Sequence, residues 1–543
     1  MAKRKVGAAA PLESPLARLL EAPHLARLVP HLAPETLHHL IRHAGLDACG
    51  ELVASATPAQ LASVLDIDLW HHAQPGRDEQ FDADRFGEWV EMLVDSDETV
   101  AARIVADLDA QLVVAGLSRY VRVFDLAANA APVSTDDEPL DRNASSLGGD
   151  FAVGGYLVRA IRTDAWDAIV ALLLELDAAH PDYFHAVMRG CRRLSDSAPE
   201  VDGLDNLLRA PAQLLHNVAV DREHRRSKQG YSTPADARAF LQMARQRKRL
   251  QPDGTPAMNP IAAAYFRAAD DAATSPDDGR STRSQHVLEP GSAGESVAEA
   301  LDAMVDVLAE AGLVPERPRA LLEGTAPAHS RLTRIRPLME HVRDTNDDAH
   351  FARSREIAFL ANTLIAGCAV QSRPFTPQEA SDAVVGICNL GLEYMGANMP
   401  PAFLVDHDLV TAFEAGWAAL FEDVSLFVAK QLIATLKALR HADAETHSEL
   451  LALRRELVKE RKAGTPWRAR DALEVLAILD TTAWISLLGL LDECPVLPAA
   501  LTANLEGQTG AVSATAFEFI STTGQIDQVR AFMARLPDAL TTP

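Results

Sequence analysis

An arginine-rich segment on a strongly acidic chain is the part of this sequence best suited to binding chemistry. Of 543 residues, 76 are acidic and 51 are basic, which gives a formal net charge of −25. Guanidinium groups pair bidentately with phosphates and carboxylates, so a cluster of them can dock a nucleotide, another phosphorylated ligand or an acidic protein segment. The residues predicted to bind such an anion or partner are Arg222, Arg225, Arg226, Lys228, Tyr231 and Arg245.

The same arginines also have a structural interpretation. On so negative a chain they could neutralise acidic faces of neighbouring helices, and structural ion pairs of this kind are common. This interpretation is favoured, although the segment stays the first place to look for a site. His224 lies between Asp221 and Arg226 and could act in acid-base or metal chemistry. A solvated polar face is favoured there, because adjacent residues on a helix point in different directions.

Two further groups of His and carboxylate residues could bind a divalent metal. In the first, His341, Asp344 and Asp348 have the spacing i, i+3, i+7, which one helix could align, with Asp347 and His350 close by. The second group comprises His441, Asp443, Glu445 and His447. Neither group matches HExxH or another spacing with a known coordination geometry. We therefore predict no metal site and no cofactor, and a metal-assisted hydrolase is kept as an alternative function.

Other motifs for chemistry or export are missing from the sequence. Gly154-Gly155 is not followed by the Lys-Ser or Lys-Thr of a phosphate loop, and no GxSxG elbow occurs. The five cysteines are scattered without CxxC spacing, which favours a reducing compartment. The negative charge opposes general nucleic-acid binding, and the apolar stretch 357–370 is well short of the roughly 20 residues of a membrane span. We expect a cytoplasmic protein.

Helices must position these groups, because strong helix formers dominate the sequence and β-branched alternation is scarce. A turn residue precedes a short apolar helix at 34–40 and again at 58–65, and looser copies occur at 82–90 and 109–117. Units of this kind are stable only against their neighbours. The predicted fold class is all-α, with stacked helical hairpins in a short α-solenoid-like array followed by antiparallel helical bundle regions.

Stretches rich in Pro, Gly, Ser and acidic residues divide the chain. The most regular pattern, 409–440, keeps the helical period for about seven turns, with Asp408 as its N-cap. A second helix, 445–462, is expected to fold back on it, and shorter helices are expected at 261–271 and 297–308. The predicted domains are 1–125, a helical hairpin array; 126–150, a linker or long loop; 151–250, a helical domain with the basic segment; 251–295, a linker; and 296–543, an antiparallel helical bundle.

Several phrases resemble an uncharacterised bacterial family of long, helical, cytoplasmic proteins, a domain of unknown function. They are Asp66-Ile67-Asp68-Leu69-Trp70, Asp221-Arg222-Glu223-His224-Arg225-Arg226, Pro234-Ala235-Asp236-Ala237-Arg238, Cys388-Asn389-Leu390-Gly391-Leu392-Glu393 and Phe413-Glu414-Ala415-Gly416-Trp417. The resemblance implies no activity and no catalytic residue. Separately, the N-terminal hairpins are weakly similar to the cytosolic N-domain of MgtE-type magnesium transporters, whose nucleotide-sensing and pore domains have no counterpart here.

The sequence favours a non-enzymatic helical scaffold or adaptor that binds a protein partner or an anionic small ligand through the arginine-rich segment. Two alternatives stay open. One is the metal-assisted hydrolase that would use the His and Asp groups. The other is a regulator that senses a nucleotide or phosphate at Arg225, Arg226 and Lys228.

Overall fold

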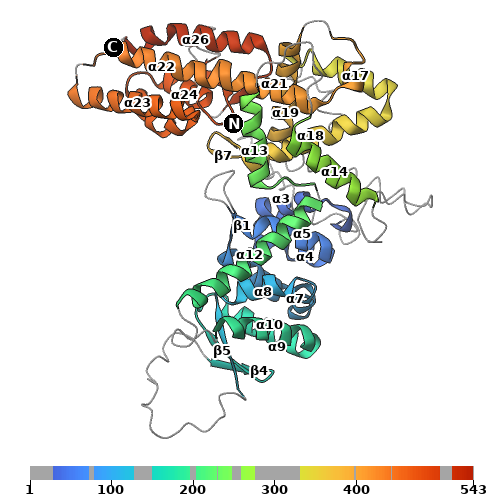
Figure 1. Cartoon of the computed structure of the whole chain (residues 1–543). Coiled ribbons are helices and arrows are strands. Elements are labelled where there is room, and N and C mark those ends of the chain that lie inside the picture. Colours follow the sequence, from blue (N-terminus) through green and yellow to red (C-terminus); the bar gives the residue numbers. More distant parts are fainter. Residues whose placement is uncertain are drawn as a thin grey trace, which may run out of the picture. The chain divides into compact units, whose positions relative to one another are not determined.

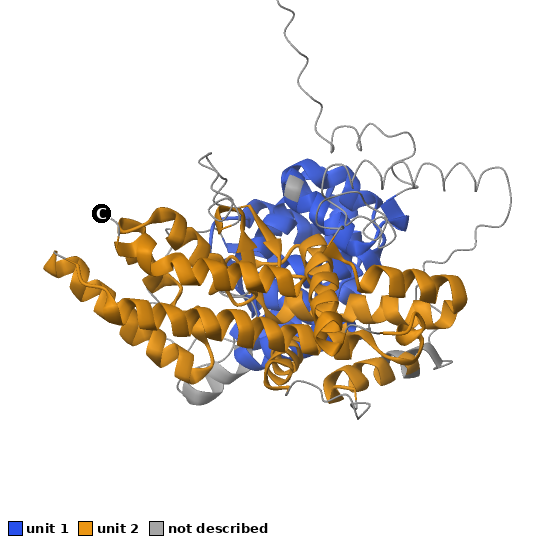
Figure 2. Ribbon diagram, turned by 90° about the horizontal axis from the view of Figure 1, so that it is seen from above, with its two compact units in different colours: residues 1–71, 79–226, 279–314 blue, residues 72–78, 227–278, 315–543 orange. Residues whose placement is uncertain are grey.

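The computed structural model of the protein describes residues 29–71, 79–126, 150–195, 204–228, 230–247, 258–274, 331–396, 399–441, 443–501 and 516–541. Most of these residues are helical (Figure 1), which confirms the all-α prediction. The chain divides into two compact units (Figure 2). Unit 1 comprises the described residues up to 226, and unit 2 the described residues from 227 onward. No helix within the described ranges combines the length and apolar character needed to cross a membrane.

Unit 1 consists of short helices around one apolar core and a small antiparallel sheet. Its helices are η1 (Val29–His31), α3 (Pro34–Ala44), η2 (Leu46–Cys49), α4 (Gly50–Ser55), α5 (Pro58–Asp68), α6 (Ala83–Ser96), α7 (Glu98–Ala106), α8 (Ala110–Leu117), α9 (Trp166–Ala179), α10 (Pro181–Ser195) and most of α12 (Leu204–Lys228). Its strands are β1 (Trp70–His71), β2 (Gln80–Phe81), β3 (Val121–Asp125), β4 (Asp150–Val153) and β5 (Tyr156–Ala160).

Side-chain caps explain where several of these helices begin. Thr57 forms a reciprocal capping box with Gln60 at the start of α5. Asp82, Asp97 and Asp109 accept hydrogen bonds from backbone N–H groups at the starts of α6, α7 and α8. The four helices predicted at 34–40, 58–65, 82–90 and 109–117 are therefore confirmed as α3, α5, α6 and α8.

A three-stranded sheet in unit 1 was not expected from the sequence. Its strand order is β3-β5-β4, and both pairs are antiparallel. Gly154 and Gly155 form the turn between β4 and β5, with φ of 53° and 86°. Residues with positive φ are what a two-residue hairpin turn requires, so these glycines serve a turn. The predicted hairpin array thus ends in a strand, since Phe124 belongs to β3.

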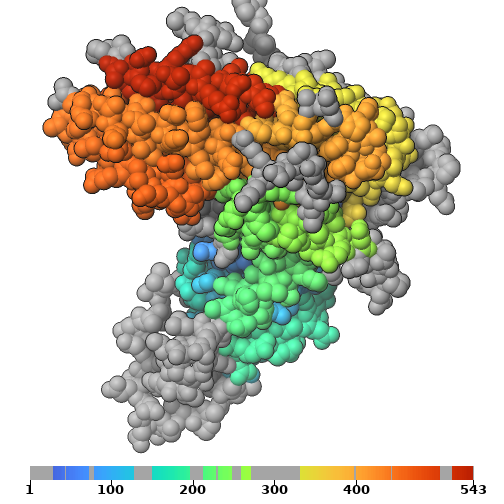
Figure 3. Space-filling view, turned by 45° about the horizontal axis from the view of Figure 1, so that its top comes forward, coloured from blue at the N-terminus to red at the C-terminus, as the bar shows by residue number. Residues whose placement is uncertain are grey.

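Unit 2 contains the longer helices. They are α13 (Pro234–Gln246), α14 (Pro260–Thr274), α17 (Ile335–Thr345), α18 (Asp347–Gly367), α19 (Pro377–Met395), α20 (Phe403–Asp406), α21 (Leu409–Ala419), η5 (Leu420–Leu426), α22 (Phe427–Ala438), α23 (Ala444–Ala463), η6 (Pro466–Ala469), η7 (Asp471–Ile478), α24 (Thr481–Leu490) and α26 (Thr523–Thr541). The strands β6 (Ala369–Val370) and β7 (Arg373–Pro374) form one hairpin, and β8 (Val496–Pro498) pairs with β9 (Phe517–Phe519). Figure 3 shows α26, in red, at the surface of the unit.

The core of unit 2 forms around the crossing of α19 and α21. Gly391 and Gly416 lie at this crossing, where a Cβ atom on Gly391 would meet the carbonyl oxygen of Ala412 at 1.8 Å and one on Gly416 would meet that of Ile387 at 2.0 Å. Only glycine lets two helix backbones approach this closely. Both glycines were part of the phrases that carry the family resemblance, and the crossing gives them a packing role.

The long helix predicted at 409–440 is present but is not a regular α-helix throughout. It runs through α21, the π-helical segment η5 and α22, and Asp408 caps its start through the N–H of Thr411 (2.6 Å). The helix predicted at 445–462 is confirmed as α23, which Gly464 ends with φ 75°. The short helix expected at 261–271 is α14, whereas the one expected at 297–308 lies outside the described residues.

Candidate functional site

Three of the predicted anion-binding arginines lie on α12 and contact carboxylates of unit 1. Arg225 donates from Nε and Nη2 to the two carboxylate oxygens of Asp66 (2.8 and 2.7 Å). Arg222 is buried, pairs with Glu79 and lies over the ring of Trp70 at 4.8 Å from its centroid. Burial lowers the pKa of Arg222.

Arg226 also pairs with Glu79, at 3.3 Å. These contacts are the neutralising ion pairs of the structural interpretation of the segment. An anion at Arg222, Arg225 or Arg226 would have to compete with carboxylates that already occupy the guanidinium groups.

The other predicted residues of the segment belong to unit 2. Arg245 lies 3.7 Å from the carboxylate of Glu493 and stacks over Trp467, at 4.2 Å from a ring centroid. Tyr231 is half-buried, and the side chain of Lys228 lies outside the described residues. The structure therefore divides the predicted site residues between two units, and binding of an anion or partner at them stays a prediction.

The His and carboxylate groups do not lie as their spacing suggested. His341 and Asp344 are on α17, but α17 ends at Thr345 and Asn346 caps the separate helix α18, which carries Asp348. The expectation that one helix aligns these three side chains is wrong, because the cap interrupts the helix. Among the described residues, no group of three or more His, Cys, Asp or Glu side chains is arranged to hold a metal ion.

A buried carboxylate in unit 1 holds three helices together. Asp68, the last residue of α5, accepts hydrogen bonds from Nε2 of His38 (3.1 Å), Nε of Arg85 (2.6 Å) and Nε1 of Trp89 (2.7 Å). Burial by itself would raise the pKa of Asp68, but these three donors outweigh it and hold the pKa well below the usual range. Arg85 also donates to Glu88 (2.6 Å). Arg85 is half-buried and Glu88 is exposed, so this ion pair lies at the edge of the core.

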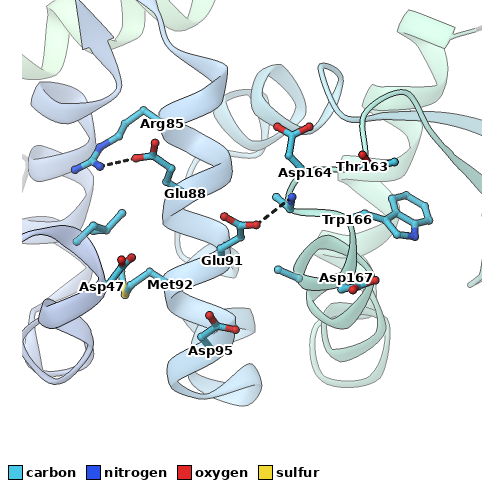
Figure 4. Close-up of a pocket in the computed structure, with 13 residues that line it drawn as sticks. Asp47, Arg85, Glu88, Glu91, Met92, Asp95, Thr163, Asp164, Trp166 and Asp167 are labelled. Carbon is cyan, nitrogen blue, oxygen red and sulfur yellow. Dashed lines mark hydrogen bonds and ion pairs between the residues drawn. The ribbon is translucent and has the colours of Figure 1, made fainter. Parts of the chain in front are cut away.

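Next to this ion pair lies a pocket of about 790 Å³ that belongs wholly to unit 1 (Figure 4). Its walls come from η2, from one face of α6 and from the residues at which α9 begins. The lining residues are Leu46, Asp47, Arg85, Glu88, Glu91, Met92, Asp95, Thr163, Asp164, Ala165, Trp166, Asp167 and Ala168. We refer to it as the acidic pocket, because six of these side chains are carboxylates and one is a guanidinium.

The carboxylates of the acidic pocket differ in their partners. Glu88 is neutralised by Arg85 and Asp164 by Arg162, which also lowers the pKa of Asp164. The others form no ion pair with any residue of the described chain. These unpaired carboxylates are Asp47, Glu91, Asp95 and Asp167.

Glu91 also organises the start of α9. The N-cap residue Ala165 has φ 55° and offers no side-chain cap, and its backbone N–H donates to Oε1 of Glu91 (3.1 Å; Figure 4). Asp167, in the first turn of α9, has a structural role as well, since acidic groups stabilise the positive end of a helix. Asp95 has neither kind of contact, and Asp47 lies in the first turn of the four-residue helix η2 but accepts no hydrogen bond from any described residue. These two are therefore the carboxylates most available to a cation.

Sequence reasoning missed the acidic pocket because its carboxylates come from three separate segments. All of its lining residues fall between 46 and 168. Residues 2–201 match DUF6178, a family of unknown function. This match bears out the resemblance to a family of unknown function for residues 2–201, and of the phrases that carry the resemblance only Asp66–Trp70 lies there. The acidic pocket lies within the matched residues, and the arginines of α12 lie outside them. No curated protein and no solved structure gives a significant match. The similarity to MgtE-type transporters is not shown by these comparisons and stays a prediction.

Proposed function

We propose that the protein is a non-enzymatic helical adaptor and that its DUF6178 region binds a basic segment of a protein partner in the acidic pocket. The observation that carries this proposal is the set of four carboxylates in the pocket without ion pairs, Asp47, Glu91, Asp95 and Asp167. Lys and Arg side chains are the natural partners of such groups.

The rest of the pocket lining supports a side-chain ligand. Trp166 is half-buried and offers apolar surface beside the carboxylates, whereas Leu46 and Met92 are almost wholly buried behind it. The alkyl stems of Lys and Arg pack on such surface while their charged ends reach polar groups. The volume of about 790 Å³ has room for more than one such side chain. The net charge of −25 also speeds encounter with a basic partner through long-range attraction.

The sequence favoured an anionic ligand or a protein partner at the arginine-rich segment. The present proposal instead places a cationic segment of a protein partner in the acidic pocket, the site that the geometry supports best. The alternative of a regulator that senses a nucleotide or phosphate at Arg225, Arg226 and Lys228 requires a ligand that displaces Asp66 and Glu79 from the arginines. The alternative of a metal-assisted hydrolase has no support from the arrangement of His, Cys, Asp and Glu in the described residues.

The test is fluorescence anisotropy with the full chain and a labelled peptide that contains four arginines separated by glycines. The variant Asp47→Asn/Asp95→Asn should weaken binding about 5- to 30-fold, since two partly exposed charge pairs contribute about 0.5–1 kcal/mol each. Glu449→Gln/Glu474→Gln is the matched control, because it removes the same charge from exposed side chains of unit 2.

Two results would overturn the proposal. One is equal weakening by the pocket variant and the control variant, which would mean that binding follows net charge alone. The other is the absence of binding by the unaltered chain at low ionic strength, where surface electrostatics are strongest.

A further inference from the structure

A shallow apolar groove of about 300 Å³ continues from the acidic pocket along α9. Asp150 and Phe151 of β4 line it together with Val170, Ala171 and Leu174 of α9, and Asp150 is paired with Arg159. Trp166 and Asp167 line both the groove and the acidic pocket, so the two hollows lie next to each other at the start of α9.

The face of α9 that lines this groove is not the face that packs on the apolar core of unit 1. The core side of α9 buries Ile169, Leu172, Leu173 and Leu176. Leu174 on the other side is 49% exposed. A surface helix ordinarily carries polar residues on its outer face, whereas here the exposed Leu174 and the partly buried Val170 and Ala171 form a small apolar strip along the groove.

Charge decides what occupies this surface. A second copy of the chain would bring another net charge of −25 to a rim that already holds the unpaired carboxylate of Asp167, so like charges oppose self-association. A partner with a basic group beside an apolar one satisfies the acidic pocket and the groove together.

The spacing along α9 sets the spacing in the partner. Leu174 lies seven positions after Asp167, which is a distance of about 10 Å at 1.5 Å per helical residue. An extended chain advances about 3.3 Å per residue, so it covers this distance in about three residues.

We infer that the acidic pocket and the groove form one docking surface, which binds an extended partner segment carrying Lys or Arg about three positions from a large apolar residue. This inference rests on the proposed function and adds the sequence class of the partner. The basic side chain enters the acidic pocket, and the apolar side chain lies between Phe151 and Leu174.

The test compares three labelled peptides on the full chain by fluorescence anisotropy. All three carry two arginines; the first has leucine three positions after the second arginine, the second has serine there, and the third has leucine directly after the arginine. The first should bind about tenfold more tightly than the other two. Leu174→Ser should abolish this gain and leave the serine peptide unaffected, while Ile478→Ser, a control at an exposed residue of unit 2, should preserve it.

The outcomes separate the inference from the proposed function. If all three peptides bind equally, the inference is wrong and the adaptor proposal stands. If none binds, both are wrong. Light scattering supplies the last comparison: a dimer that Leu174→Ser dissociates would show that a second copy covers the groove, which also overturns the inference.

Discussion

Replacing Asp68 with asparagine tests whether one carboxylate holds α3, α5 and α6 together. Asp68 is 7% exposed and accepts from His38, Arg85 and Trp89. Asparagine has the same size but only one acceptor oxygen and no charge, so it can serve at most part of this set of donors.

The expected loss follows from these contacts. Hydrogen bonds to a charged group contribute about 1.5–3 kcal/mol each, and a buried donor left without an acceptor costs about 1–3 kcal/mol. Arg85 keeps Glu88 as a partner, which limits its share of the loss. We therefore expect Asp68→Asn to cost about 3 kcal/mol in the local free energy of opening.

Hydrogen exchange measured by mass spectrometry on the full chain resolves this effect region by region. A loss of about 3 kcal/mol corresponds to roughly 100-fold faster exchange in α5 and α6, while α19 and α21 of unit 2 should keep their rates. Asp95→Asn, an exposed residue of α6 without a partner among the described residues, is the control and should change exchange little.

Acid should imitate the substitution at Asp68. Because its folded-state pKa lies below the ordinary value of about 3.9, its contribution is complete above that value and is lost as the pH falls below it. Less than threefold acceleration of exchange in Asp68→Asn at neutral pH would refute the assignment of Asp68 as the link among the three helices.

Three further predictions concern other buried contacts. Gly391→Ala should destabilise unit 2 by about 3 kcal/mol, measured by urea unfolding, because its Cβ would meet backbone at the crossing; Gly524→Ala, which has space, should be nearly neutral. Burial raises the pKa of Glu356, in α18, to about 7, so the folded protein keeps a proton on this carboxyl that the unfolded chain has already lost. The free energy of unfolding should therefore fall as the pH rises toward and through 7. Glu356→Gln should flatten this pH dependence, and an unchanged pH profile would contradict the assignment. Arg225→Gln should leave Asp66 charged and buried and should speed exchange in α12 about 10- to 100-fold; unaltered exchange would show that this pair contributes little to stability.

The sequence predicted helices best where local signals agreed. At α23, Asp443 supplies an N-cap and Gly464 ends the helix, so the predicted range 445–462 differs from Ala444–Ala463 by one residue at each end. The strands β3 and β5 were missed because they contain only five residues each. Alternation such as that of Val121 and Val123 is too short to stand out beside long helical patterns.

The candidate site could not be found by spacing. Asp47, Asp95 and Asp167 lie 48 and 72 residues apart in the chain, and only the packing of η2, α6 and α9 brings them to one pocket. Conversely, the arginines of α12 are close in sequence, but the charges that engage them, such as Asp66, come from far along the chain. Local charge patterns indicate which groups are present, and tertiary packing determines which remain available.

The π-helical segment η5 has a consequence for how this protein can change in evolution. A π-helical turn carries one residue more than an α-helical turn. The segment Leu420–Leu426 therefore contains one residue more than a regular α-helix would need there, and the helix continues through it into α22. Related chains one residue shorter at this point could continue from α21 to α22 as a regular helix. The segment is therefore the position in the long helix at which a single-residue insertion or deletion is best accommodated, and an alignment of homologous chains should place its gaps there.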